Sequence, residues 1–336
     1  MEQNVRSLII GHAIGDALGV PVEFASRERL EADPVIGMRG YGTHKVPEGT
    51  WSDDTSMTLC LLESLTRLNK VDYQDIMNNF LLWMEDGEFT ATWTAFDIGI
   101  TTRHALLRLK PDPISSKMGA KGTDPLLCGE DSEYSNGNGS LMRIAPMALY
   151  LNGNLTNDNL QLVHNVSKLT HAHVRSQMAC GIYVFIATEL LSDKRLHAIE
   201  TGIEKAYQFY HEQDDFRTEM NIFSRLWNVE QFAKLPEYDI KSSGYVVDTL
   251  EAAIWCLLNT DNYCECVLKA VNLGGDTDTV GAVTGGLAGL LYGEKDIPPS
   301  WKNELRRIDY IEKLCDDFSR NHWESDTLYD TKNLQD

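Results

Sequence analysis

The chain has 336 residues, of which 43% are hydrophobic and 24% charged, a composition typical of a soluble globular protein. Its 50 acidic residues outnumber 30 basic ones and give a formal net charge of −20, which argues against a nucleic-acid-binding surface. No apolar run reaches the roughly 18 residues that a membrane span needs. Seven cysteines without a Cys-x-x-Cys pair indicate reduced thiols. We expect a cytoplasmic, monomeric protein without nucleic-acid or membrane partners.

Apolar residues recur mostly at helical spacing, and few stretches alternate with period two, so the sequence predicts an all-α fold. We expect a single domain over residues 1–323 and a polar, frayed tail at 324–336. The segment 112–139 is rich in Pro, Gly, Ser and Lys and predicts a long loop. In chain order, the predicted helices are Val5–Val20, Met57–Leu68, Ile76–Met84, Gly99–Leu109, Leu141–Tyr150, His164–Thr170, Ser176–Leu191, Leu196–Tyr210, Val246–Leu258 and Val280–Tyr292.

The first and last of these helices each carry glycines four residues apart. Glycine inside a helix costs roughly 1 kcal/mol of helix stability relative to alanine. Two such stripes therefore indicate close helix packing that offsets this cost. We expect the two helices to pack near each other; the alternative is two glycine-rich helices that are tolerated independently. The stripes are Gly11, Gly15 and Gly19 in the first helix, and Gly281, Gly285 and Gly289 in the last.

An acidic cluster, Ser52-Asp53-Asp54-Thr55, comes immediately before the Met57 helix. One interpretation is a helix cap, because Ser or Asp accepts helix N–H bonds and acids suit the first turn. Capping accounts for one or two of these oxygens. Adjacent carboxylates repel each other unless a cation or protons neutralise them, so a metal site is the other interpretation.

A second cluster, Gly274-Gly275-Asp276-Thr277-Asp278-Thr279, places acids at alternate positions after two glycines. Combined with the first cluster, it would form a site of carboxylate and hydroxyl oxygens, which suits Mg²⁺ or Mn²⁺. Four carboxylates exceed what one Mg²⁺ takes from a protein, so two ions roughly 3.5–4 Å apart are the more natural occupancy. Zinc is disfavoured without His or Cys. The proposed ligands are Ser52, Asp53, Asp54, Asp276, Asp278 and Thr279.

Four motifs in this order resemble those of the ADP-ribosylglycohydrolases, the relatives of dinitrogenase reductase-activating glycohydrolase and of the ADP-ribosylarginine hydrolases. They are Gly15-Asp16-Ala17-Leu18-Gly19, Ser52-Asp53-Asp54-Thr55, Asn138-Gly139-Ser140-Leu141-Met142-Arg143 and Gly275-Asp276-Thr277-Asp278-Thr279. The resemblance spans roughly residues 7–293. It implies a compact orthogonal multi-helix bundle with a binuclear Mg²⁺ or Mn²⁺ centre held by the two acidic clusters, and hydrolysis of the bond between ADP-ribose and a modified side chain.

The resemblance also assigns three further side chains. Glu23 matches an acid near the metals, Asp97 an acid close to the ribose, and His171 a position near the ribose or phosphate. Alternatively, Glu23 is a solvated loop acid and Asp97 a helix cap. Asp53, Asp97 and Glu23 are the candidates to accept a proton from the attacking water. The stretch Ala91–Thr94 departs from the glycine expected in relatives, which leaves the shape of the ribose-side loop open.

The turn Gly137-Asn138-Gly139-Ser140 precedes an apolar helical run, so its backbone N–H groups would face an anion, and a pyrophosphate is the candidate. Arg143 either adds charge there or pairs with an acid. Tyr245 packs either on the ligand or in the core.

The expected reaction is metal-dependent release of ADP-ribose from a protein. We expect arginine as the modified residue, because the motif set resembles the arginine-directed and bacterial members of the family more than the serine-directed ones. The N-glycosidic bond would break through an oxocarbenium-like state. Three alternatives stay open: hydrolysis of serine-linked or other O-linked ADP-ribose, a two-metal phosphohydrolase acting on ADP-ribose-type nucleotides, and an ADP-ribose-binding module without catalysis.

Overall fold

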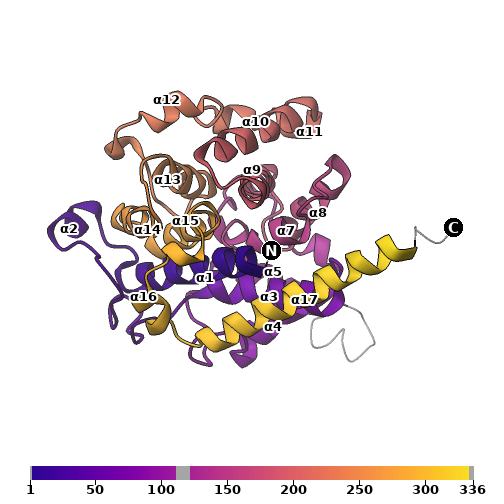
Figure 1. Cartoon of the computed structure of the whole chain (residues 1–336), viewed down its shortest axis with the longest axis horizontal. Helices are drawn as coiled ribbons and strands as arrows, with labels where there is room; N and C mark the ends of the chain where they lie inside the picture. Colours follow the sequence, from indigo (N-terminus) through magenta and orange to yellow (C-terminus); the bar gives the residue numbers. More distant parts are fainter. Residues whose placement is uncertain (1, 111–121, 333–336) are drawn as a thin grey trace.

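The computed structural model describes residues 2–110 and 122–332, which form sixteen α-helices and no strand (Figure 1). The all-α prediction is confirmed. The helices are α1 Glu2–Gly19, α2 Arg27–Ala32, α3 Asp53–Leu68, α4 Tyr73–Asp86, α5 Ile100–Leu109, α7 Ala145–Tyr150, α8 Asn157–Lys168, α9 Val174–Ser192, α10 Leu196–Glu212, α11 Asp214–Arg217, α12 Val229–Ala233, α13 Val246–Leu258, α14 Tyr263–Asn272, α15 Thr277–Tyr292, α16 Pro299–Glu304 and α17 Ile308–Lys332.

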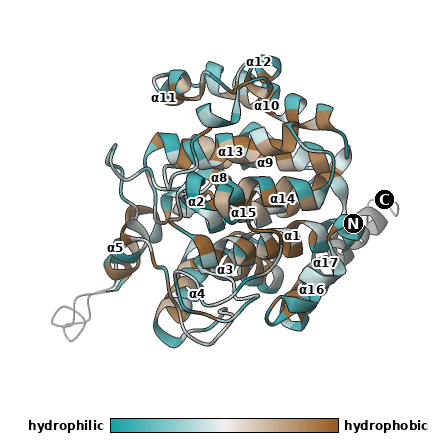
Figure 2. Ribbon diagram, turned by 90° about the vertical axis from the view of Figure 1, so that its left-hand side faces the viewer, coloured by the Kyte–Doolittle hydropathy of each residue, from teal (hydrophilic) through white to brown (hydrophobic). Residues whose placement is uncertain are grey.

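Helices α1 and α15 lie at the centre of the molecule and pack against each other along their lengths. On one side α3 and α17 contact α1, and α4 packs on α3. On the other side α15 contacts α9, α13 and α14, while α10–α12 close the far end, as the two orthogonal views show (Figures 1 and 2). One cluster of buried apolar side chains runs through these layers.

The two glycine stripes face each other, as the sequence predicts. A Cβ atom on Gly11 would lie 2.5 Å from the carbonyl oxygen of Gly285, and one on Gly15 would lie 2.0 Å from that of Gly281. Side chains at these positions would therefore force the helices apart. The stripe of α1 faces that of α15 in reverse order, so the two helices run antiparallel.

Helix α1 is long and apolar enough to span a membrane by length and composition, but 89% of this apolar stretch is buried inside the protein. It is therefore a core helix of this fold. All seven cysteines are free thiols, and all but the half-buried Cys264 are buried, as their spacing indicates.

Several helix boundaries differ from the prediction. Helix α7 begins at Ala145 rather than Leu141, with Pro146 in its first turn, because the preceding residues form a 3₁₀ turn at Asn138–Ser140. Helix α8 begins after Thr156, whose hydroxyl caps it, and ends at Lys168, so the predicted helix at His164–Thr170 is the last part of a longer one. The sequence pattern also missed α2, α11, α12, α14, α16 and α17.

Residues 324–332, where the sequence predicts a polar tail, continue α17. No glycine or proline interrupts the chain between Ile308 and Lys332, so nothing local ends the helix. Residues 333–336 and most of the first half of the predicted 112–139 loop lie outside the described residues. Its remainder includes short 3₁₀ turns at Pro125–Leu127 and Asn138–Ser140.

Candidate metal centre and substrate cleft

The first acidic cluster forms the N-terminus of α3 and is anchored by Asp16 of α1. Both carboxylate oxygens of Asp16 accept the backbone N–H of Ser52, at 2.9 and 3.0 Å. One of them also accepts the backbone N–H of Thr55 at 3.0 Å and its hydroxyl at 2.6 Å. Asp16 is completely buried, and burial raises its pKa to about 6. No role was predicted for this acid, although an acid on a buried helix face requires hydrogen-bond donors.

Ser52 caps α3, as the first interpretation holds, and its hydroxyl donates to Oδ2 of Asp54 at 2.9 Å. The hydroxyl of Thr279 donates to the same oxygen at 3.3 Å. The other oxygen, Oδ1, is buried without a hydrogen-bond partner among the described residues. Burial, and then the charges of neighbouring acids, raise the pKa values of Asp53 and Asp54 well above their ordinary value. Capping therefore accounts for only part of this cluster.

The second acidic cluster forms the start of α15. Gly274 and Gly275 precede it with φ of +76° and +74°, a left-handed conformation that glycine adopts without strain. Asp278 is buried; its Oδ1 accepts the backbone N–H of Thr279 at 2.9 Å. Its Oδ2, like Oδ1 of Asp54, has no hydrogen-bond partner in the described part of the chain. Burial, followed by the charges of four nearby acids, raises the pKa of Asp278 well above its ordinary value.

The two clusters meet between the N-termini of α3 and α15. Single ligand atoms of Asp16, Asp54 and Asp278 lie within 4.8 Å of one another. A second group with the same spacing consists of Asp278 with Glu23, His44 and Asp97. Asp278 is therefore shared by two adjacent groups that are each able to hold a cation.

Glu23 and Asp97 reach this region from loops. Glu23 is only 5% exposed, so the solvated-acid interpretation is wrong, and its carboxylate is hydrogen-bonded to Nε2 of His44. Burial raises the pKa of Glu23 to about 7, and the hydrogen bond raises that of His44. Asp97 is half-buried with φ of +57°, and it does not cap α5, whose cap position is Gly99. No local sequence signal identified His44.

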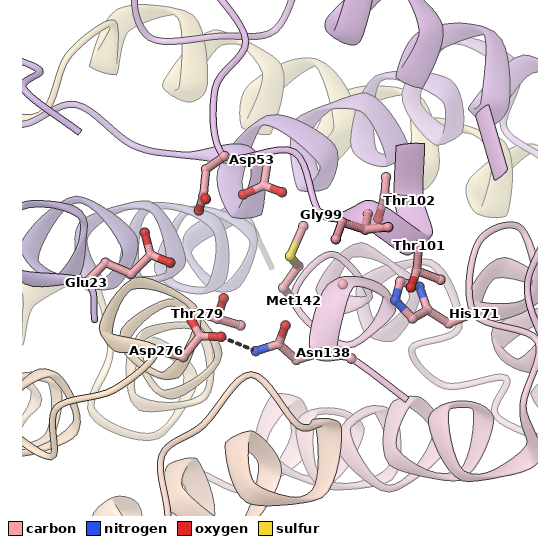
Figure 3. Close-up of a pocket in the computed structure, with 14 residues that line it drawn as sticks. Glu23, Asp53, Gly99, Thr101, Thr102, Asn138, Met142, His171, Asp276 and Thr279 are labelled. Carbon is pink, nitrogen blue, oxygen red and sulfur yellow. Dashed lines mark hydrogen bonds between the residues drawn. The ribbon is translucent and has the colours of Figure 1, made fainter. Parts of the chain in front are cut away.

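A cleft of about 210 Å³ opens next to the acidic clusters (Figure 3). Its lining includes Glu23, Asp53, Asp97, Asp276 and Thr279 from the acidic side. The facing wall consists of Gly99–Thr102 at the start of α5, the turn Gly137–Gly139, Met142 and His171. Most of the predicted catalytic and substrate-binding side chains therefore share one cavity.

Asn138 links the two walls. Its side-chain amide donates to Oδ2 of Asp276 at 3.0 Å (Figure 3) and to the hydroxyl of Thr249 at 2.9 Å. Its backbone N–H donates to the carbonyl oxygen of Gly244 at 3.0 Å, so this N–H is not available to an anion. The turn lies directly against His171, because a Cβ on Gly139 would approach that ring to 2.8 Å.

Two predicted substrate-binding side chains do not line the cleft. Ser140 is fully buried, and its hydroxyl is hydrogen-bonded to that of Ser167 at 2.9 Å. The 3₁₀ turn directs Asn138 to the cleft and Ser140 into the core. Tyr245 pairs with Gly137 through an isolated backbone bridge, while the Arg175 guanidinium lies 5.8 Å from the centre of its ring. Tyr245 thus supports the turn from outside the cavity.

Arg143 supports the turn from the core side and fits neither predicted role. It is fully buried, and its guanidinium donates to the carbonyl oxygens of Gly139 and Val166 and to the hydroxyl of Thr170, the last at 2.8 Å. Burial lowers its pKa to about 10. The Thr170 hydroxyl, accepting from Arg143, is also 2.7 Å from Nδ1 of His171. It therefore donates to Nδ1, which leaves Nε2 protonated as a donor. Burial lowers the pKa of His171 to about 3, so the ring is neutral.

Comparison with known proteins places this architecture among related chains. A family model described as ADP-ribosylglycohydrolase matches residues 1–327. The ADP-ribosylarginine hydrolase Tri1 of Serratia proteamaculans is 32% identical over 93% of this chain and 77% of its own length. The ADP-ribosyl-[dinitrogen reductase] glycohydrolase of Rhodospirillum rubrum is 31% identical over 88% of both chains. A solved structure titled ADP-ribosylglycohydrolase-related protein complex superposes with a TM-score of 0.75 and 32% identity, covering 96% of this chain and 98% of that one.

Proposed function

Because this chain belongs to the ADP-ribosylglycohydrolase family, we propose that it is a metal-dependent hydrolase that cleaves the N-glycosidic bond between ADP-ribose and a modified arginine side chain. The observation that carries the proposal is the pair of buried carboxylate oxygens without partners, Oδ1 of Asp54 and Oδ2 of Asp278, beside the cleft. The arginine linkage is supported by the relative that is named an ADP-ribosylarginine hydrolase.

The residues present fit a cation centre. Two unit negative charges 4.8 Å apart, the upper limit within each group, repel by about 3.5 kcal/mol at an effective dielectric constant of about 20. A helix N-terminus offsets only about 0.3–1 kcal/mol per acid, so the starts of α3 and α15 cannot balance several carboxylates. Cations or bound protons must do so. The two oxygens without partners are where a cation would complete the coordination that the protein leaves open.

As ligands of two Mg²⁺ or Mn²⁺ ions we assign two sets of residues, one at the N-terminus of α3 and one at the N-terminus of α15. They are Ser52, Asp53 and Asp54, and Asp276, Asp278 and Thr279. All of these donors are oxygens, which suits hard divalent cations. Bound there, the ions would supply Lewis-acid charge to organise the ribose and activate the water nucleophile. Asp16 is not among the assigned ligands, because four hydrogen bonds already occupy its oxygens; it holds the start of α3 in place.

The remaining cleft residues divide the work of binding and proton transfer. Glu23, Asp53 and Asp97 all line the cavity and are the candidates to accept the proton of the attacking water. Glu23 is favoured, because its pKa, which burial raises to about 7, is close to the value at which a general base is most effective near neutral pH. His171 presents its Nε2–H as a donor, which suits a ribose hydroxyl or a phosphate oxygen.

The linkage assignment follows from the chemistry of the leaving group. Cleavage at the anomeric carbon passes through an oxocarbenium-like state, and the departing group must take up the bonding electron pair. A positively charged guanidinium accepts this electron pair readily, because it leaves as a neutral guanidine. No dedicated acid is therefore required beside it. The carboxylates that line the cleft also suit a cationic side chain and the positive charge that develops on the ribose.

Product analysis tests the proposal directly. Wild-type protein is incubated with arginine-linked and serine-linked ADP-ribosyl peptides in Mg²⁺, in Mn²⁺ and in chelator, and products are identified by mass spectrometry. We expect free ADP-ribose from the arginine peptide only, and only with metal. Release from serine would overturn the linkage, and AMP or phosphate would indicate a phosphohydrolase. Nucleotide binding without any product would indicate a binding module.

A further inference from the structure

His44 lies in the loop between α2 and α3, next to Glu23 of the cleft wall, and the reaction proposed above gives it no role. Its side chain is 16% exposed and its Nε2 is hydrogen-bonded to Oε2 of Glu23. The imidazole also packs on the ring of Phe96, with 5.1 Å between ring centres. Two contacts therefore fix this ring, one to the carboxylate and one to the loop that carries Asp97.

The segment before His44 is fastened to the backbone that carries Glu23. The backbone N–H of Thr43 donates to the carbonyl oxygen of Pro21 at 3.0 Å, and the Thr43 hydroxyl donates to the carbonyl oxygen of Glu23 at 2.8 Å. Gly42 permits this approach, since a Cβ there would lie 1.7 Å from the carbonyl oxygen of Pro21. These contacts hold the segment that carries His44 against the segment that carries Glu23, and so set the position of the imidazole relative to Glu23.

The Glu23 carboxylate needs such a partner to stay where it is. It is buried within reach of Asp97 and Asp278, and like charges at that spacing repel each other. Swinging out to solvent would relieve both the repulsion and the desolvation. His44 supplies a hydrogen-bond donor to this carboxylate, and that bond opposes the movement.

We propose that His44 is a positioning residue, which donates from Nε2 to Glu23 and holds that carboxylate at the cleft wall, directed toward the reacting centre. This inference rests on the proposed function for its kinetic test. Since Glu23 accepts, Nε2 must carry the proton. His44 acts through Glu23 and makes no contact with substrate, so its loss should lower the rate of turnover more than the affinity for substrate.

Substitutions at His44 separate positioning from packing. His44→Phe keeps a ring against Phe96 but removes the donor, whereas His44→Gln retains an N–H donor. Loss of an outer-shell partner typically costs about 10- to 100-fold, so we expect His44→Phe to lower kcat by that factor with KM and thermal stability nearly unchanged. His44→Gln should recover most of the rate, and imidazole should partly restore His44→Ala. His197→Phe, at an exposed histidine of α10, should behave like wild type.

Wild-type kcat in His44→Phe would overturn the proposal, as would equal losses in His44→Phe and His44→Gln with no rescue by imidazole. If wild-type protein released ADP-ribose from no substrate, the proposed function would fail. Nuclear magnetic resonance would still test the hydrogen bond between His44 and Glu23. The imidazole ¹⁵N resonances of His44 should move in Glu23→Gln and stay in place in Asp131→Asn, a change at an exposed acid. Unmoved resonances in Glu23→Gln would refute the pairing itself.

Discussion

Asp278→Asn should change the stability of the protein in opposite directions with and without metal. Asp278 belongs to both acidic groups and has one oxygen without a partner. In chelator, its negative charge is repelled by the other acids, so the neutral amide relieves strain. With metal bound, the same charge becomes a ligand, so the amide removes stabilisation.

The magnitudes follow from the spacing of the group. Each charged neighbour within 4.8 Å contributes repulsion of about 3.5 kcal/mol at an effective dielectric constant of about 20. Because burial raises the pKa of Asp278 well above its ordinary value, proton uptake already relieves part of this cost. We expect the metal-free variant to gain about 1–3 kcal/mol. A ligand at 100 times its Kd stabilises by about 2.7 kcal/mol, and at about 2–4 °C per kcal/mol loss of one ion lowers Tm by roughly 5–10 °C.

Differential scanning calorimetry at pH 7.5, in chelator and in saturating Mn²⁺ or Mg²⁺, measures both effects. The variant should unfold above wild type in chelator and below it in metal. Asp131→Asn, at an exposed acid, should follow wild type in both conditions. A variant that is less stable than wild type in chelator would show that Asp278 is not a repelled charge. A variant that keeps the full metal-induced shift would show that Asp278 is not a ligand.

Two further predictions concern pH and packing. Burial raises the pKa values of Asp16 to about 6 and Glu23 to about 7. The folded metal-free protein therefore binds these two protons more tightly than the unfolded chain does. The stability that these protons contribute is lost as the pH rises toward 7. The gap in Tm between metal-loaded and chelated protein should therefore widen from pH 5.5 to 7.5; a constant or narrowing gap would contradict this. The buried histidines have lowered pKa values, which makes both forms more stable as pH rises, so their effect cancels in the difference. They are His12, His164 and His171. Gly285→Ala should lower the free energy of unfolding by about 1–3 kcal/mol or more, because its Cβ would lie 2.3 Å from a carbonyl oxygen of α1. The control Gly37→Ala meets only an ordinary contact at 3.5 Å and should be nearly neutral. Equal losses of the two variants in chemical denaturation would argue against the close approach.

The parts of this molecule that local rules govern were predictable from the sequence. Helix α13 begins and ends where apolar periodicity places it, at Val246–Leu258, and Ser52 caps α3 as its residue type indicates. The acidic clusters were recognisable because carboxylates so close in sequence remain close in any fold. That the clusters would meet was an inference from chemistry, since four acids form a hard-cation site only when they are gathered together.

The contacts that depend on tertiary structure were not predictable. Glu23 and His44 are 21 residues apart in two loops, and nothing local pairs them. The 3₁₀ turn at Asn138–Ser140 directs its side chains alternately to the cavity and to the core. Only part of the predicted substrate-binding turn therefore lines the cavity. Arg143 was expected either to add charge for an anion or to pair with an acid, because the sequence shows only its charge. In the fold it is used for its hydrogen-bond geometry, bracing that turn through carbonyl oxygens.

The glycine stripes connect the packing of the core to the chemistry of the site. Helices α1 and α15 run antiparallel, so the end of α1 lies against the start of α15: a Cβ on Gly19 would lie 2.4 Å from Cα of Asp278, and the Thr277 hydroxyl donates to the carbonyl oxygen of Gly19 at 2.8 Å. Asp16, which holds the start of α3, directly follows a stripe glycine, Gly15. The close approach therefore sets the separation between the acidic groups of α3 and α15. Each stripe glycine costs roughly 1 kcal/mol of helix stability, and the close packing that offsets this cost also brings the two acidic clusters together.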